Sequence, residues 1–113
     1  MLDDITSVTL ATALSGLAAR QRVSANNIAN IETPNFKASQ VSFEDSLRAA
    51  VSAGDPSSAA LSQSSQSGPV SANGNNVSLD TETVTDQKTQ LQYQLLSGAL
   101  TSKFGLLETV LKG

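Results

Sequence analysis

Apolar residues recur at steps of three and four along roughly the first thirty positions of the chain. The row consists of Ile5, Val8, Ala11, Leu14, Leu17, Ala18, Ala25 and Ile28. This period predicts an amphipathic helix over residues 1–31. The acidic and hydroxyl side chains at Asp3, Asp4, Thr6 and Ser7 suit the start of such a helix, because they can cap its first N–H groups.

A narrower stripe on the same helix alternates steps of four and three, which is the spacing of a coiled-coil seam. It comprises Leu14, Ala18, Gln21, Ala25 and Ile28. Two interpretations stay open: the stripe packs inside an ordinary helical bundle, or it contacts another subunit. Arg20 and Arg22 lie outside the stripe, and we expect both on the solvent-facing side of the helix.

A second apolar row lies near the other end of the chain. It runs through Tyr93, Leu96, Leu100, Phe104, Leu107 and Leu111, again at steps of three and four. The row predicts a helix over residues 81–113, with acidic residues at its start and Lys112 and Gly113 at its end. About 30 residues at 1.5 Å each give a rod of roughly 45 Å. Apolar faces of this length invite assembly with copies or relatives.

The middle of the chain has a different composition. Residues 52–76 hold eight serines, and their sizeable apolar residues are only Leu61 and Val70. Such a segment buries too little apolar surface to offset the entropy of ordering, so we expect a flexible polar loop over residues 52–80. Residues 32–51 are expected to form a junction with a short extended or helical segment. The predicted fold is therefore all-α: two long terminal helices in a hairpin or coiled coil, joined by these two segments.

Composition excludes several classes of chemistry. The chain has 113 residues and a formal net charge of -3, which disfavours nucleic acid and anionic membranes as partners. It contains no cysteine and no histidine, so disulfides, thiol catalysis, imidazole catalysis and Cys/His metal sites are ruled out. Its carboxylates are scattered, and its glycines form no phosphate-binding loop. We expect no enzyme activity, no catalytic residue, no cofactor and no metal site.

The start of the chain is acidic, whereas a secretory signal peptide begins with basic residues. No segment approaches the roughly 20 apolar residues that span a bilayer. We therefore expect no direct membrane insertion. If the protein works outside the cytoplasm, it must leave by a route that does not read a cleaved signal.

The most distinctive stretch is NNIANIETPNFKA, residues 26–38. Pro34 biases the residue before it away from helix, and Asn30 tolerates a left-handed helix end, so the first helix should stop close to Asn30. Asn26 and Asn27 are poor residues for a helix interior. Their amides are more useful as hydrogen-bond partners for another segment.

This stretch resembles the N-terminal signature of the bacterial flagellar axial proteins, which form the rod and the hook. The resemblance is carried by ANNIAN at residues 25–30 and by TPNFK at residues 33–37. The continuation TPNFKASQVSFEDSL, the later segment GNNVSLDTE and the QLQYQ motif look most like those of a proximal rod protein. Departures from the family pattern include Phe36 where a tyrosine is common and Thr89 where an asparagine is common.

The resemblance implies a structural subunit of the basal-body rod that polymerises through paired terminal helices and transmits torque. It implies partners that are copies of the chain, FlgC-like rod proteins, a FliE-like adaptor, the MS ring and the type III export apparatus. It also implies a periplasmic rod location, reached without a cleaved signal peptide. Alternatives are another rod protein such as FlgC, or a cytoplasmic helical-hairpin adaptor or export chaperone.

The two helix rows and the distinctive stretch together define the expected assembly interface. Its residues are Leu14, Ala18, Gln21, Ala25, Asn26, Asn27, Ile28, Asn30, Thr33, Pro34, Phe36, Tyr93, Leu96, Leu100, Phe104 and Leu107.

Overall fold

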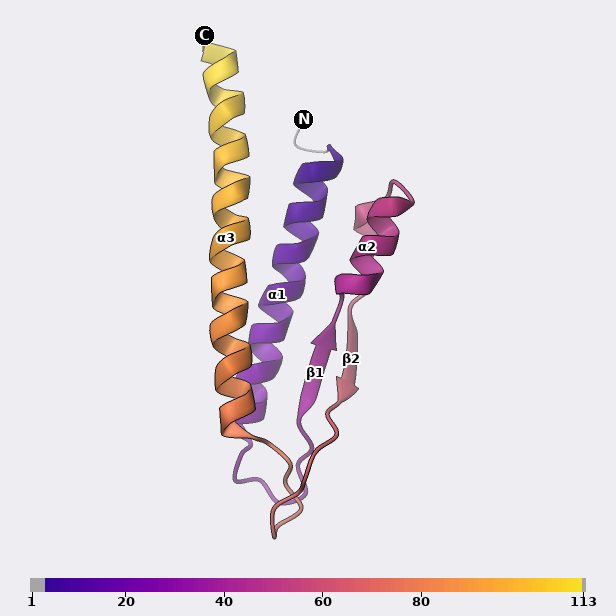
Figure 1. Cartoon of the computed structure of the whole chain (residues 1–113), viewed down its shortest axis with the longest axis vertical. Coiled ribbons are helices and arrows are strands. Elements are labelled where there is room, and N and C mark those ends of the chain that lie inside the picture. The colour runs from indigo at the N-terminus through magenta and orange to yellow at the C-terminus, as the bar shows by residue number, and fades with distance from the viewer. Residues whose placement is uncertain (1–3, 113) are drawn as a thin grey trace.

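Two long helices, α1 (Ile5–Ala29) and α3 (Leu79–Lys112), lie side by side and run in opposite directions (Figure 1). The computed structural model describes residues 4–112, apart from the side chains of Leu107 and Lys112. The molecule is elongated, with principal extents of 64 × 26 × 15 Å. Among the described residues, neither long helix combines the length and the apolar character that a membrane crossing requires.

The ends of α1 follow from local chemistry. Asp4 caps its start, where the carboxylate Oδ1 accepts a hydrogen bond from the backbone N–H of Ser7 at 2.8 Å. The helix ends at Ala29, and Asn30 is the C-cap residue. Asn30 has φ -104°, so it does not adopt the left-handed conformation that the sequence suggested. Its side chain instead donates to the carbonyl of Asn26 at 2.8 Å.

The segment between the long helices forms an arm beside α1, which we call the hairpin arm (residues 39–66). Its elements in chain order are β1 (Ser39–Ser42), α2 (Glu44–Ser52), a 3-10 helix η1 (Pro56–Ser58) and β2 (Ser62–Ser65). The two strands pair antiparallel, with Ser39 opposite Ser65 and Ser42 opposite Ser62. The arm therefore begins and ends close to the lower end of the molecule in Figure 1. We call this end, where the loop after α1 meets the loop before α3, the base.

The all-α prediction is wrong, because the chain also forms a two-stranded sheet. β1 and α2 lie within residues 32–51, where a short extended or helical segment was expected, whereas β2 lies within the predicted polar loop of residues 52–80. The helical hairpin is present only in part, since α1 packs against the arm as well as against α3. The sequence concealed the sheet because β2 is made of serine and glutamine and all four of its residues are exposed. A two-stranded ribbon is marginal alone, and β1 gains support by burying Val41.

A small apolar core joins α1 to the arm. It consists of Ala13, Leu17, Val41 and Phe43, with Val23, Leu47 and Leu96 packed against it. Gly16 is needed there, because a Cβ at this position would lie 2.6 Å from the ring of Phe43. The contact of the Phe43 ring with Gly16 therefore holds the arm against α1.

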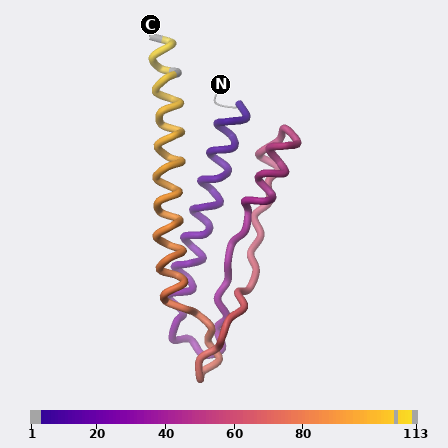
Figure 2. Tube along the Cα trace, in the orientation of Figure 1, coloured from indigo at the N-terminus to yellow at the C-terminus, as the bar shows by residue number. Residues whose placement is uncertain are grey.

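The connections at the base of the molecule lie beside one another, which the chain trace makes plain (Figure 2). The N–H of Asn35 donates to the carbonyl of Asn73 at 2.9 Å. The N–H of Asn76 donates to the carbonyl of Phe36 at 3.3 Å. Gly74 has φ +83°, a left-handed conformation that favours glycine, and a Cβ there would meet Asn35 Oδ1 at 2.3 Å. The base is thus a closely packed crossing of two polar loops.

Candidate assembly surface

A buried carboxylate connects the three parts of the molecule near the base. Glu82, at the start of α3, is only 1% exposed. Its oxygens accept hydrogen bonds from Ser24 Oγ at 2.8 Å, Asn27 Nδ2 at 3.0 Å and Gln66 Nε2 at 3.0 Å. We call these four residues the polar junction. The positive end of the helix dipole also favours a carboxylate in the first turn of α3.

Asn27 links the polar junction to the backbone of β1. It is fully buried, and its side chain pairs with the backbone of Ser39 in both directions. Nδ2 donates to the Ser39 carbonyl at 2.8 Å, and Oδ1 accepts from the Ser39 N–H at 3.0 Å. Because Nδ2 also donates to Glu82, both of its N–H groups are used within the subunit. The amide predicted to meet another segment does so, and that segment belongs to the same chain.

Two further asparagines, in the opposite loop, hold the segment that follows α1. Asn75 Nδ2 donates to the carbonyls of Asn30 and Thr33, each at 2.8 Å, and so joins the turn that follows α1 to the opposite loop. Asn76 Oδ1 accepts from the N–H of Ala38 at 2.6 Å. Sequence reasoning assigned neither role. The signal in the sequence is the GNNVSLDTE segment, which resembles the family but does not by itself indicate partners for its amides.

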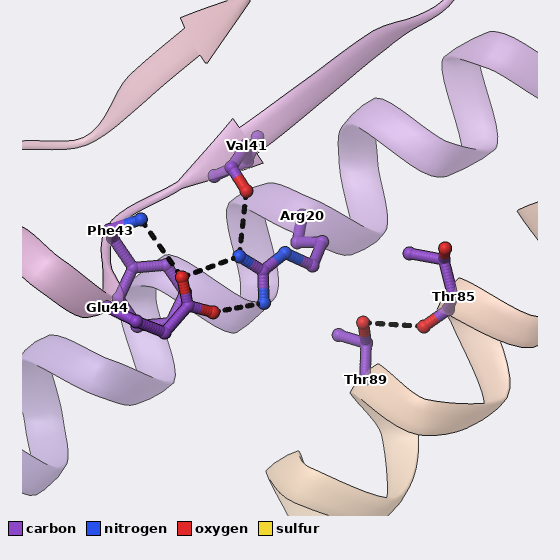
Figure 3. A network of polar contacts seen from close by, with 6 residues as sticks. All are labelled: Arg20, Val41, Phe43, Glu44, Thr85 and Thr89. Atoms are coloured by element: carbon purple, nitrogen blue, oxygen red, sulfur yellow. Dashed lines mark hydrogen bonds and ion pairs between the residues drawn. The ribbon is translucent and has the colours of Figure 1, made fainter. Parts of the chain in front are cut away.

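Arg20 ties α1 to the arm (Figure 3). Its Nη1 lies 2.6 Å from Glu44 Oε1, and its Nη2 donates to Glu44 Oε2 at 3.0 Å and to the Val41 carbonyl at 2.7 Å. The guanidinium also stands 5.0 Å from the centre of the Phe43 ring, a cation–π distance. The hydrogen bond from Arg20 lowers the pKa of Glu44 to about 2. The expectation that Arg20 faces solvent is wrong, since its side chain is 17% exposed.

A polar groove of about 420 Å³ lies between the arm and α3, beside Arg20. On the α3 side it is lined by Thr85 and by Thr89, whose hydroxyl donates to the Thr85 carbonyl at 2.7 Å (Figure 3). Thr89 is 1% exposed, and its hydroxyl finds its acceptor on its own helix.

The other end of the molecule is apolar and open. Lys103 Nζ pairs with Asp4 Oδ2 at 3.0 Å, which places the start of α1 beside residue 103 of α3. The hydrogen bond from the Ser7 N–H, and then Lys103, lower the pKa of Asp4 to about 2. Residues 104–112 extend beyond the described start of α1 (Figure 1), and we call them the α3 overhang. Among its described side chains, the exposed large apolar ones are Phe104 at 40%, Leu106 at 69%, Val110 at 74% and Leu111 at 78%.

The predicted α1 stripe lies next to the face that the subunit buries. Leu14, Ala18 and Gln21 are half-buried, and Ala25 and Ile28 are exposed. The residues of α1 that are buried are Ser7, Ala13, Gly16, Leu17, Ala19, Ser24 and Asn27. Several stripe residues directly follow a buried residue in the sequence. Because one residue turns a helix by about 100°, the stripe faces away from the buried side and much of it stays accessible.

The remaining predicted interface residues divide between the base and α3. Asn26, Thr33 and Pro34 are exposed at the base, where Asn30 and Phe36 are half-buried. On α3, Tyr93 and Phe104 are exposed, and Leu96 and Leu100 are half-buried. The side chain of Leu107 lies outside the described part of the chain. The structure therefore does not gather these residues into one patch within the subunit.

Comparisons with known proteins identify the family of the chain. Residues 9–37 match the family model described as "Flagella basal body rod protein". The chain is 37% identical to "Flagellar basal body rod protein FlgB" of Bacillus subtilis (strain 168) over 117 residues, covering 92% of this chain and 91% of the relative. It is 32% identical to the protein of that name from Borreliella burgdorferi over 121 residues, covering 88% and 90%. The resemblance inferred from the sequence is confirmed.

Proposed function

Because the chain belongs to the FlgB family of flagellar basal body rod proteins and is a structural subunit of that rod, we propose that it joins its neighbours through its two long helices. The observation that carries the proposal is the α3 overhang. Four large apolar side chains there are 40% to 78% exposed on a helix that continues past its own partner. Covering such surface with another subunit removes it from water, at about 25 cal/mol per Å².

The contacts proposed are heterologous, meaning that different surfaces of successive subunits meet. Such contacts repeat around an axis and build rings or open helical assemblies, as a shaft requires, instead of closing a dimer. The interface in this proposal comprises the accessible α1 stripe, the exposed base residues and the apolar row of α3. Asn27 contributes indirectly, by fixing the base that presents its neighbours.

The proposed place of the subunit is the proximal rod, beside FlgC-like rod proteins, a FliE-like adaptor and the MS ring. The proposed route is the flagellar type III export apparatus, without cleavage. Both statements rest on the family resemblance of the terminal segments. Mass spectrometry of the subunit from purified basal bodies tests them: an uncleaved chain cross-linked to rod neighbours is expected. A subunit recovered only from the cytoplasm would instead indicate an adaptor or chaperone.

Replacement of the gene in the flagellated source organism tests the assembly proposal. Val110→Ser removes an apolar side chain that is 74% exposed in the overhang, and Val70→Ser makes the same change at a residue 56% exposed in the loop. We expect Val110→Ser to reduce the number of complete basal bodies seen by electron microscopy and the swimming speed, and Val70→Ser to leave both unchanged. Equal behaviour of the two variants would contradict the proposal.

A further inference from the structure

An open apolar groove of about 470 Å³ lies among the three helices. Its floor is formed by the buried residues Ala13 and Leu17 of α1 together with Phe43. One wall carries Leu47 and Val51 of α2, and the opposite wall carries Leu95 and Leu96 of α3. Leu95 is 64% exposed although it stands beside this floor. The groove thus exposes the outer side of the small apolar core.

The shape of the groove suits a helix. Its floor and walls are three helices that run roughly lengthwise in the molecule (Figure 1). A fourth helix laid along α1, between α2 and α3, would complete a four-helix cluster in which apolar stripes face one another. The occupant should therefore be a helical segment with several large apolar side chains.

The α3 overhang is a segment of this kind, but it cannot reach the groove of its own chain. Leu96 is part of the groove wall, and Phe104 follows it on the same helix eight residues later, about 12 Å along the axis. The helix carries the overhang away from the groove. Leu96 packs against the apolar core to which α1 contributes Ala13 and Leu17. The same apolar row continues through the half-buried Leu100 into the exposed overhang, so the open surface is an extension of the α1–α3 interface.

We propose that this groove receives the α3 overhang of a second copy of the chain. The proposal rests on the proposed function and names the partner and the contact. One subunit carries both halves of the contact, separated along its length, so each copy offers its overhang to one neighbour and its groove to another. Such a head-to-tail contact repeats without closing on itself, which suits a subunit of a rod.

Site-specific cross-linking tests this pairing, because the natural chain has no cysteine. Two full-length chains are mixed, one carrying Val51→Cys in the groove and the other, with an added tag, carrying Val110→Cys in the overhang. Mild oxidation is expected to give a mixed disulfide dimer, whose mass lies between that of two untagged chains and that of two tagged chains. The matched control replaces the groove chain with one carrying Val70→Cys, at an exposed position outside the groove, and is expected to give little mixed dimer.

The outcomes separate the two proposals. If chains associate in sedimentation but Val70→Cys forms mixed dimer as readily as Val51→Cys, the groove is not the docking site, while assembly through the terminal helices stands. If the chain stays monomeric at every concentration reached, both proposals fail. If, in basal bodies, the groove cysteine pairs only with another rod protein, the second copy is the wrong occupant.

A charge substitution gives an independent measurement of the same contact. Leu95→Glu places a carboxylate in the groove wall, and Leu79→Glu makes the same change at a leucine 53% exposed at the start of α3, outside the groove. Leu95→Glu should weaken self-association at least about tenfold, the equivalent of losing one buried leucine. Leu79→Glu should change it less than twofold. Circular dichroism of both variants checks that the subunit keeps its helices.

Discussion

The base and the far end of the subunit are built on opposite principles. At the base, buried polar groups are paired with one another: Glu82 takes three hydrogen bonds and Asn27 uses both of its N–H groups. At the far end, the α3 overhang exposes Leu106, Val110 and Leu111 with exposures of 69% to 78%. Polar networks depend on geometry and so fix one arrangement of the chain, whereas apolar contact tolerates different partners. The base therefore specifies the subunit, and the far end is available to its neighbours.

The largest expected effect comes from breaking the base. Asn27→Ala would remove three hydrogen bonds, leaving the Ser39 N–H without its partner and the buried carboxylate of Glu82 with one donor fewer, at a cost of about 3 kcal/mol of unfolding free energy. Asn26→Ala, at the exposed neighbouring position, should cost less than about 0.5 kcal/mol. Urea unfolding followed by circular dichroism measures both. Similar losses for the two variants would mean that the polar junction does not specify the fold.

Two glycines extend the comparison to packing. Gly16→Ala would push a Cβ against a Phe43 ring that Arg20 already covers, and overpacking of this kind costs about 2 kcal/mol. Gly98→Ala meets no described atom within 4 Å, so the better helix propensity of alanine should stabilise the isolated subunit by up to about 1 kcal/mol. The unfolding temperature should therefore fall for Gly16→Ala and rise for Gly98→Ala. A higher unfolding temperature for Gly16→Ala would show that the core beside Phe43 can accommodate an additional methyl group.

The open end should respond in assembly and not in folding. Leu106→Ser removes a leucine side chain that is 69% exposed, so the unfolding free energy should change by less than about 0.5 kcal/mol. Self-association should fall about tenfold, because the apolar surface that a neighbour covers is lost. Analytical ultracentrifugation and urea unfolding of the same sample separate the effects. A variant that unfolds more easily but associates normally would reverse the roles assigned to the two ends.

The smallest effect concerns the ion pair between Arg20 of α1 and Glu44 of α2. The pKa of Glu44 is lowered to about 2 in the folded chain, chiefly by its hydrogen bond with Arg20. A lowered folded pKa contributes stability above the unfolded value of about 4.5, and this stability is lost as the pH falls from there toward 2. Because the Glu44 side chain is 49% exposed, the contribution should stay below about 1 kcal/mol.

Glu44→Gln is expected to remove this part of the pH dependence. Asp45→Asn, at a side chain 96% exposed, serves as the control and should leave the stability nearly unchanged at pH 7. Urea midpoints between pH 2 and pH 6 give the comparison. Identical pH profiles for Glu44→Gln and the natural chain would show that Arg20 holds the arm without help from the charge of Glu44.

The candidate interface could be predicted only in part. The row through Leu96, Leu100 and Phe104 was visible because helical spacing is a local property of the sequence. The polar junction was not visible, since Ser24 and Glu82 are separated by 58 positions and look like ordinary surface residues. Arg20 was misplaced for the same reason: nothing near it in the sequence indicates Glu44 as its partner.

The sequence by itself determined the two long helices, the stop of the first helix near Asn30 and the family to which the chain belongs. Each depends on residues that are neighbours along the chain: apolar periodicity, a helix-ending Thr-Pro pair and contiguous motifs. Only the tertiary structure decided that a serine-rich segment forms a strand, that Asn27 serves its own subunit and that the overhang passes the start of α1. These features depend on which distant segments meet, and backbone pairing and burial leave little mark on the residue types involved.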